Sequence, residues 1–306
     1  MRRLLVLGLL ACASDPSLIR YDRAMLAAER RLSQGDSEGA LGDFAALEAR
    51  SASPEDRVEA RLRRVEALRR QGRLPDAEAA ARELFQEARA LDPELRAKIG
   101  LARARIILDL GDEARGQGLL RRLVARFPST VAGGRAFLLL RGRLAERDPS
   151  AFAAYCRERY EASPDSELAD TFAYEGGRVH FARNTPEDDR VAEKAFQIVL
   201  TRWAMRSSGV WDDAIWDLSL ILHRQGRFRE EIRLLERFLE TRVIADQPGS
   251  YEHVNYKFAW LRIARVTLDD LIEPREAARW LTEFPDHFEY ARARDEALHW
   301  LAVAWD

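Results

Sequence analysis

The chain has 306 residues and a formal net charge of −2, with 47% hydrophobic and 33% charged side chains. Such a composition supplies a buried core and excludes an intrinsically disordered chain. Alanine, leucine, arginine and glutamate, which favour helix, outnumber valine, isoleucine and threonine, and the 11 prolines and 17 glycines fall between long stretches of them. The composition therefore predicts an all-α protein.

The first twelve residues have the pattern of an export signal. A basic start at residues 1–3 precedes an apolar run over 4–10. This run is far shorter than the roughly 20 residues that a membrane-spanning helix needs. Residues 9–12, Leu-Leu-Ala-Cys, resemble the lipobox of bacterial lipoproteins. The resemblance implies a signal peptide over 1–11 and a lipid on Cys12, whereas the alternative is a buried N-terminal helix with a chance cysteine.

A short linker follows the cysteine. Residues 12–17 precede the first helical pattern, and such a segment reaches at most roughly 18 Å when extended. The body of the protein, residues 18–306, is therefore expected to stay close to its membrane. Residues 13 and 14 are Ala and Ser, without an aspartate. By resemblance to the proteobacterial sorting rule, this implies the periplasmic face of the outer membrane, with the other leaflet or the inner membrane as the alternative.

One pattern repeats along the body. A polar turn, often with a glycine, leads to a helix that carries a small residue near its start. Seven such anchor positions are spaced by 37 to 45 residues: Ala40, Ala77, Gly116, Ala153, Ala192, Ile232 and Ala277. Apolar residues follow each anchor after three or four and again after seven positions, which is the stripe of an amphipathic helix.

A second apolar-periodic stretch precedes several of these helices, at 62–68, 101–108, 211–222 and 258–268. Two helices per period, joined by a turn, make a helical hairpin. One hairpin cannot bury its own apolar stripe, so neighbouring hairpins must stack. The sequence thus predicts a solenoid of about seven helical hairpins.

The hairpins resemble the tetratricopeptide repeat (TPR). Gln-Gly-Arg-Leu at 71–74, followed by Ala77, and Gln-Gly-Arg-Phe at 225–228 match the turn and the small residue of that family. The usual period is about 34 residues, and here it is longer. The resemblance covers 18–306. It implies a right-handed α-solenoid whose first helices line a concave groove for protein segments.

Three junctions between helices carry a further resemblance. They read Phe-Pro-Ser-Thr at 127–130, Ser-Pro-Asp-Ser at 163–166 and Phe-Pro-Asp-His at 284–287. They look like the junctions of periplasmic repeat lipoproteins, namely the BamD-type outer-membrane assembly lipoproteins and the Tol-Pal associated repeat proteins. Proline ends one helix and Asp or Ser caps the next, so the motif is structural and transfers neither family's function.

No motif for catalysis stands out. The five histidines have no His-x-x-x-His spacing, the two cysteines form no Cys-x-x-Cys pair, and a phosphate-binding glycine loop is missing. Cys156 lies in the apolar phase of its predicted helix, so we interpret it as a buried structural cysteine and not as a reactive thiol. We expect no enzyme activity, no catalytic or metal-ligating residue and no cofactor.

Basic residues gather in residues 96–147, which carry 12 basic and four acidic side chains. The candidate contacts for a partner are Lys98, Arg103, Arg105, Arg135 and Arg141. Lys98 and Arg105 are seven residues apart on one predicted first helix and share a face. A basic groove suits an acidic peptide, an anionic head group or a glycan carboxylate, whereas an ordinary solvated face is the alternative. Nucleic acid is not expected for an exported, net-acidic protein.

All seven tryptophans lie at or after residue 203. Most of them fit the packing between helices. Trp300 and Trp305 are different, because they lie in an apolar helix after the last predicted hairpin. A solenoid end normally needs a polar outer face, so we expect this helix either to dock a partner or to fold back as a cap.

These features predict a membrane-anchored protein-interaction scaffold of the bacterial cell envelope. The alternative is an accessory subunit, or a catalytically inert relative, of a peptidoglycan-processing enzyme, because the helical ring of lytic transglycosylases resembles such repeats. A lipoprotein that senses a small ligand is a third possibility, although the sequence offers no pocket signature.

Overall fold

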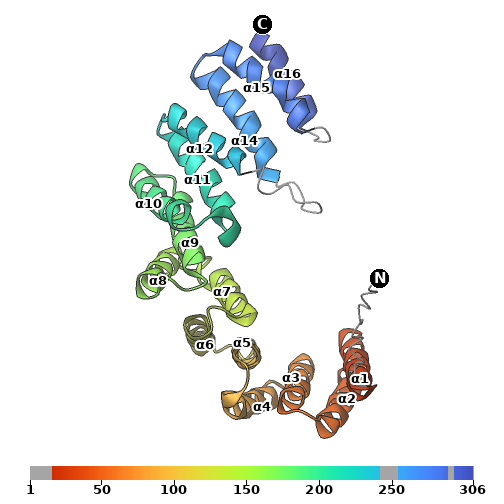
Figure 1. Ribbon diagram of the computed structural model, residues 1–306. Coiled ribbons are helices and arrows are strands. Elements are labelled where there is room, and N and C mark those ends of the chain that lie inside the picture. Colours follow the sequence, from red (N-terminus) through yellow and green to blue (C-terminus); the bar gives the residue numbers. More distant parts are fainter. Residues whose placement is uncertain (1–15, 242–253, 289–292, 306) are drawn as a thin grey trace, which may run out of the picture. The chain divides into compact units, whose positions relative to one another are not determined.

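The computed structural model describes residues 16–241, 254–288 and 293–305 (Figure 1). The predicted signal peptide and Cys12 lie outside them. Every regular element in these three ranges is helical, so the prediction of an all-α solenoid is confirmed. No described helix is both long and apolar enough to cross a membrane.

The helices follow one another in pairs, each with a first and a second helix. In chain order the described pairs are α1 (Pro16–Ser33) with α2 (Ser37–Arg50), α3 (Pro54–Arg70) with α4 (Leu74–Glu87), α5 (Pro93–Asp109) with α6 (Glu113–Arg126), α7 (Val131–Leu144) with α8 (Pro149–Ala162), α9 (Ala169–Phe181) with α10 (Pro186–Arg202), α11 (Trp211–Arg224) with α12 (Phe228–Glu240), and α14 (Val254–Arg265) with α15 (Pro274–His287). The last helix, α16 (Arg294–Trp305), packs against α15. Short turns η1 (Ala88–Ala90), η2 (Met205–Ser207) and the π-helical η3 (Val266–Asp270) follow α4, α10 and α14.

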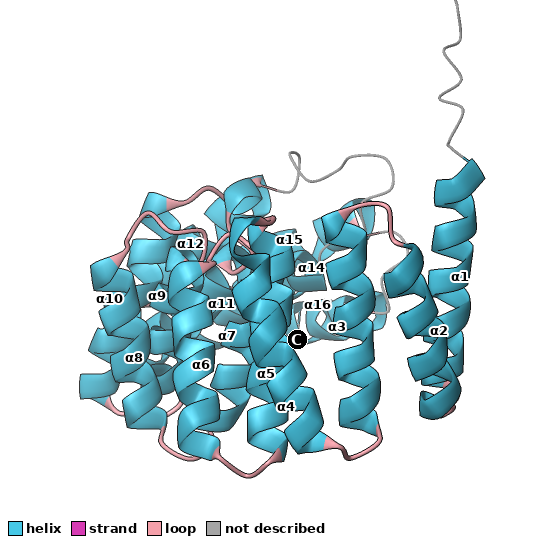
Figure 2. Ribbon diagram, turned by 90° about the horizontal axis from the view of Figure 1, so that it is seen from below, coloured by secondary structure: helices cyan, strands magenta, loops and turns pink. Residues whose placement is uncertain are grey.

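The chain divides into two compact units, residues 1–140 and 141–306. In the first unit, α3 packs against α2 and α5 against α4; in the second, α11 packs against α10 and α14 against α12. Figure 2 shows α3 to α6 side by side, joined by short loops at their ends. In each of these cases the first helix is held by the second helix before it, as stacking of hairpins requires.

Glycine closes four of the turns between a first and a second helix. Their φ angles are 93°, 75°, 83° and 68° for Gly35, Gly72, Gly111 and Gly226. Such left-handed backbone carries a steric penalty for residues with a Cβ atom. In the turn between α9 and α10, Asn184 has a φ of 53° and takes the place of the glycine. Asparagine tolerates this conformation better than most residues, which explains why the glycine signal fails there.

The predicted anchors on the second helices are buried, with one correction. Six of them, including Ala77 and Ala192, are buried as expected, but Ile232 is only half-buried. The buried position in α12 is Glu231, whose exposure is 0%. It follows Gly226 by five residues, just as Ala77 follows Gly72. The prediction is wrong by one residue because a carboxylate, bound by side chains of other helices, occupies the position of a small residue.

One predicted helix junction is also wrong. α6 and α8 end before Pro128 and Pro164, as expected, but Pro285 lies inside α15, which continues to His287. A proline removes the hydrogen bond of its own nitrogen. The helical hydrogen bonding still continues three residues after this proline, where the Phe288 N–H donates to the Phe284 carbonyl at 3.0 Å.

Aromatic side chains fill a large core in the second unit. Trp211 and Trp260 are 3% and 8% exposed and belong to this core, which confirms the packing interpretation for these two tryptophans. The Trp260 Nε1–H donates to the Trp280 carbonyl at 2.6 Å. Cys156 is 0% exposed, so its interpretation as a buried cysteine is confirmed as well.

Candidate functional site

The first helices of the N-terminal unit offer an open charged face. α3 contacts both α1 and α5, so these first helices lie next to one another in this unit. On α5, Lys98 and Arg105 are exposed, and no carboxylate in the described residues binds either of them. They share their face with Asp109, which accepts a hydrogen bond of 2.7 Å from Arg69 Nη1. The structure thus brings two of the predicted basic residues together on one open surface.

Two other predicted residues are bound by their own chain. Arg103 is half-buried, and its Nη2 lies 2.9 Å from Glu78 Oε1 on α4. Arg115 Nη2 lies 3.0 Å from the same oxygen. Arg141, in the second unit, forms an ion pair with Glu175 on α9. These guanidinium groups hold helices together, and a partner that binds them has to compete with carboxylates already in place.

The remaining basic candidate, Arg135, is exposed on α7. Leu138 lies nearly one helical turn further along and is 53% exposed. The two residues together present a cation beside an apolar side chain. Such a combination suits an amphipathic partner, in which acidic and apolar side chains alternate around one face.

Ion pairs between successive helix pairs recur along the chain. An arginine of a first helix binds a carboxylate of the second helix before it, as in Arg103 with Glu78. Arg224 Nη2 lies 2.6 Å from Asp189 Oδ1, and Arg262 Nε lies 2.5 Å from Glu231 Oε1. Sequence reasoning missed these pairs, although the arginines could be seen in the first helices, because the acidic partner is 25 to 35 residues away.

The second unit holds a polar cavity of about 370 Å³. It is bordered by α11, α14, η3 and α16, and its lining includes Trp216, His223, Phe258, Arg262, Arg265, Asp270 and Glu296. A π-helical segment such as η3 is uncommon and is often found at functional sites. After the face of α5 with Lys98 and Arg105, this cavity is therefore the second candidate binding surface.

A buried carboxylate lies behind this cavity. Glu231 receives the Arg262 hydrogen bond and lies 3.0 Å, through Oε2, from Nδ1 of His223. Burial raises the pKa of Glu231, and the charges of Arg262 and His223 oppose this rise. The residues form a hydrogen-bonded network that ties α11, α12 and α14 together. No cluster of possible metal ligands occurs in the part of the chain that the structure describes.

The two C-terminal tryptophans differ in their surroundings. Trp300 is half-buried, and the Arg265 guanidinium carbon lies 4.7 Å from its ring centroid, a cation–π distance. Trp305 is 71% exposed. Because α16 packs against α15, Trp300 helps to cover the last helix pair, while Trp305 points its ring to the solvent.

No protein-family model and no curated protein matches the sequence of this chain. Solved structures with a similar fold do exist. The C-terminal part of a TPR repeat-containing protein from Cytophaga hutchinsonii has a TM-score of 0.51 at 12% identity, over 90% of this chain and 99% of its own. The TPR2AB domain of yeast Sti1, in complex with an HSP90 peptide, has a TM-score of 0.36 at 14% identity, over 94% and 99%. At such identities the first likeness shows the fold alone, an α-solenoid of the TPR type.

Proposed function

We propose that this chain, whose fold is that of TPR proteins, is a protein-interaction scaffold that a lipid on Cys12 anchors in the bacterial cell envelope. The TPR-type fold supports the scaffold. The lipobox-like residues 9–12 and the short linker that follows support the anchor and its place at the periplasmic face of the outer membrane.

The observation that carries the scaffold is the open face of α5. Lys98 and Arg105 are exposed there without a carboxylate partner in the described residues. Seven residues of helix separate them by about 10 Å along the axis. Carboxylates three residues apart in a polyproline II segment lie on one face about 9 Å apart, which is close to this spacing. The face therefore suits an acidic segment of a partner protein, which charge-assisted hydrogen bonds would hold.

Labelling of cells with a palmitate analogue tests the anchor. The wild-type chain should carry the label and stay with the envelope membranes after fractionation. A Cys12→Ser variant should lose the label and appear in the soluble fraction. An unlabelled, soluble wild-type chain would refute the anchor without touching the scaffold.

Cross-linking and pull-down from detergent-solubilised envelope test the scaffold. A double variant, Lys98→Glu with Arg105→Glu, should recover at least about tenfold less of any specific partner, because opposed like charges cost several kcal/mol. The matched control is Arg23→Glu with Arg190→Glu, two exposed arginines elsewhere, which changes the net charge equally. Equal recovery with both double variants would exclude the α5 face as the binding site.

A further inference from the structure

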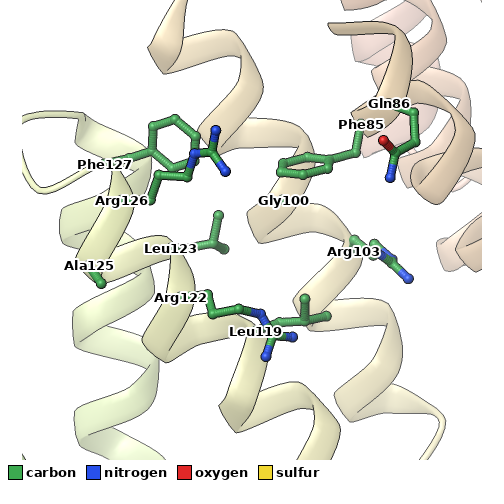
Figure 3. Close-up of a pocket in the computed structure, with 10 residues that line it drawn as sticks. All are labelled: Phe85, Gln86, Gly100, Arg103, Leu119, Arg122, Leu123, Ala125, Arg126 and Phe127. Atoms are coloured by element: carbon green, nitrogen blue, oxygen red, sulfur yellow. The ribbon is translucent and has the colours of Figure 1, made fainter. Parts of the chain in front are cut away.

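A groove with apolar walls lies between the second helices α4 and α6, above the first helix α5 (Figure 3). Its volume is about 420 Å³. The open face of α5 and this groove are formed by different sides of the N-terminal unit. The groove and the proposed binding site at Lys98 and Arg105 have no residue in common.

Glycine at position 100 is the reason that the groove reaches the backbone of α5. A Cβ atom there would lie 2.5 Å from Cδ2 of Leu123 and 3.3 Å from the Phe85 ring. Figure 3 shows Phe85 and Phe127 on opposite sides, with Leu123 between them. Leu119 completes the apolar lining. The groove therefore reaches the backbone of α5 and has aromatic and aliphatic side chains on its walls.

Positive charges surround the opening. Arg122 and Arg126 are exposed on α6, one helical turn apart, and no carboxylate in the described residues binds them. Arg96 lies with its guanidinium carbon 5.0 Å from the Phe85 ring centroid, and its buried Nε has no hydrogen-bond partner. Burial, and then repulsion by Arg126 and Arg89, lower the pKa of Arg96. Arg96 is thus repelled by two basic neighbours and has no acidic partner in the described residues.

A groove of about 410 Å³ occupies the same place in the second unit, between α8 and α10 above α9. Its lining mixes both signs, with Arg157 and Lys194 beside Glu161, and with His180 and Arg183 bound to Asp188. Grooves between neighbouring second helices therefore occur in both units. Both grooves contain aromatic side chains, but no acidic residue lines the first one, where Arg103 is bound to Glu78 and Arg122 and Arg126 have no acidic partner in the described residues.

We propose that the groove of the first unit docks an acidic amphipathic helix of a partner protein. A bulky apolar side chain of this helix inserts between Phe85 and Phe127. Two carboxylates one turn apart bind Arg122 and Arg126, since residues at i and i+4 are about 6 Å apart on either helix. The size of the groove lies within the roughly 300–1,000 Å³ of pockets that enclose a ligand.

The test uses the purified full chain and a fluorescent, alanine-rich peptide of about 16 residues, long enough to form a helix. The peptide carries a Leu-Phe pair between two glutamates one turn apart; a second peptide has glutamine in their place. Arg122→Glu with Arg126→Glu removes the cations, and Ala125→Trp fills the groove from an exposed position that lines it. Arg23→Glu with Arg190→Glu, at two exposed arginines outside both proposed sites, is the control of equal charge. Circular dichroism verifies that each variant is folded.

The proposal expects the glutamate peptide to bind, and the glutamine peptide to bind at least about tenfold more weakly. Both groove variants should lose binding to a similar degree, while the control keeps it. An equal loss of binding in the control would show that the peptide responds to the overall charge of the protein and not to the groove. This result would overturn the proposal. The proposal would also be overturned if the protein bound phosphatidylglycerol vesicles through Arg122 and Arg126 but did not bind the peptide. The proposed function rests on Lys98 and Arg105, whereas the groove proposal rests on Arg122 and Arg126. Each proposal can therefore fail while the other holds.

Discussion

The Nε–H of Arg262 on α14 donates a hydrogen bond of 2.5 Å to the carboxylate of Glu231 on α12. The Glu231 side chain is fully buried, at the position where most other helix pairs bury alanine or glycine. A buried charge is tolerated only when it is paired and hydrogen-bonded. The sixth and seventh helix pairs are therefore joined by a specific polar contact in addition to apolar packing.

Replacement of Glu231 by alanine should destabilise the protein strongly. It leaves Arg262 without its acid next to an apolar core, and loss of one partner of a buried pair costs about 3–5 kcal/mol. Chemical denaturation followed by circular dichroism measures the loss. Glu276→Ala is the control, because its pair with Arg279 is exposed and contributes at most about 1 kcal/mol. Equal losses in the two variants would contradict the assigned role of Glu231.

Two adjacent glycines of α7 should respond in opposite ways to alanine. A Cβ atom on Gly133 would lie 1.9 Å from the Phe127 carbonyl oxygen, so Gly133→Ala should cost about 1–3 kcal/mol or more. A Cβ atom on Gly134 meets nothing within 4 Å. Gly134→Ala should therefore stabilise the helix by up to about 1 kcal/mol. Urea denaturation of the two variants provides the measurement, and the same sign for both would refute the close approach.

Asp188 should make stability depend on pH in the acid range. Hydrogen bonds from His180, then Thr185 and Arg183, hold its pKa at about 2, below the ordinary value of 3.8. Because the folded pKa is the lower one, the contribution is present above pH 3.8 and disappears as the pH falls through about 2. The difference in unfolding free energy between wild type and Asp188→Asn should shrink as the pH falls from about 4 through about 2. A difference that grows on acidification would contradict this assignment.

The thiol of Cys156 should be inert in the folded protein. Its side chain is fully buried, and burial raises the pKa of the thiol, so the reactive thiolate is suppressed. A chain with Cys12→Ser has Cys156 as its single thiol. It should not react with Ellman's reagent under native conditions but should react fully in guanidinium chloride. Rapid reaction of the native protein would show that the helix opens locally.

Much of the fold could be read from periodicity. The apolar stripe of each second helix involves residues three to seven positions apart, and these are neighbours on any helix. Anchors such as Ala77 and Gly116 are therefore buried as predicted, and the turn glycines have the expected left-handed backbone. The shared face of Lys98 and Arg105 follows from the same local geometry.

Only the tertiary structure decided which charged groups are available. Whether Arg103 is free depends on Glu78, 25 residues earlier, and the burial of Glu231 depends on Arg262, 31 residues later. The groove above Gly100 exists because α5 separates α4 from α6. Helical periodicity is a local property of the chain, whereas ion pairs and grooves arise where distant helices meet. For this reason the sequence alone predicted the scaffold, and the packing of its helices determined the surfaces that remain open.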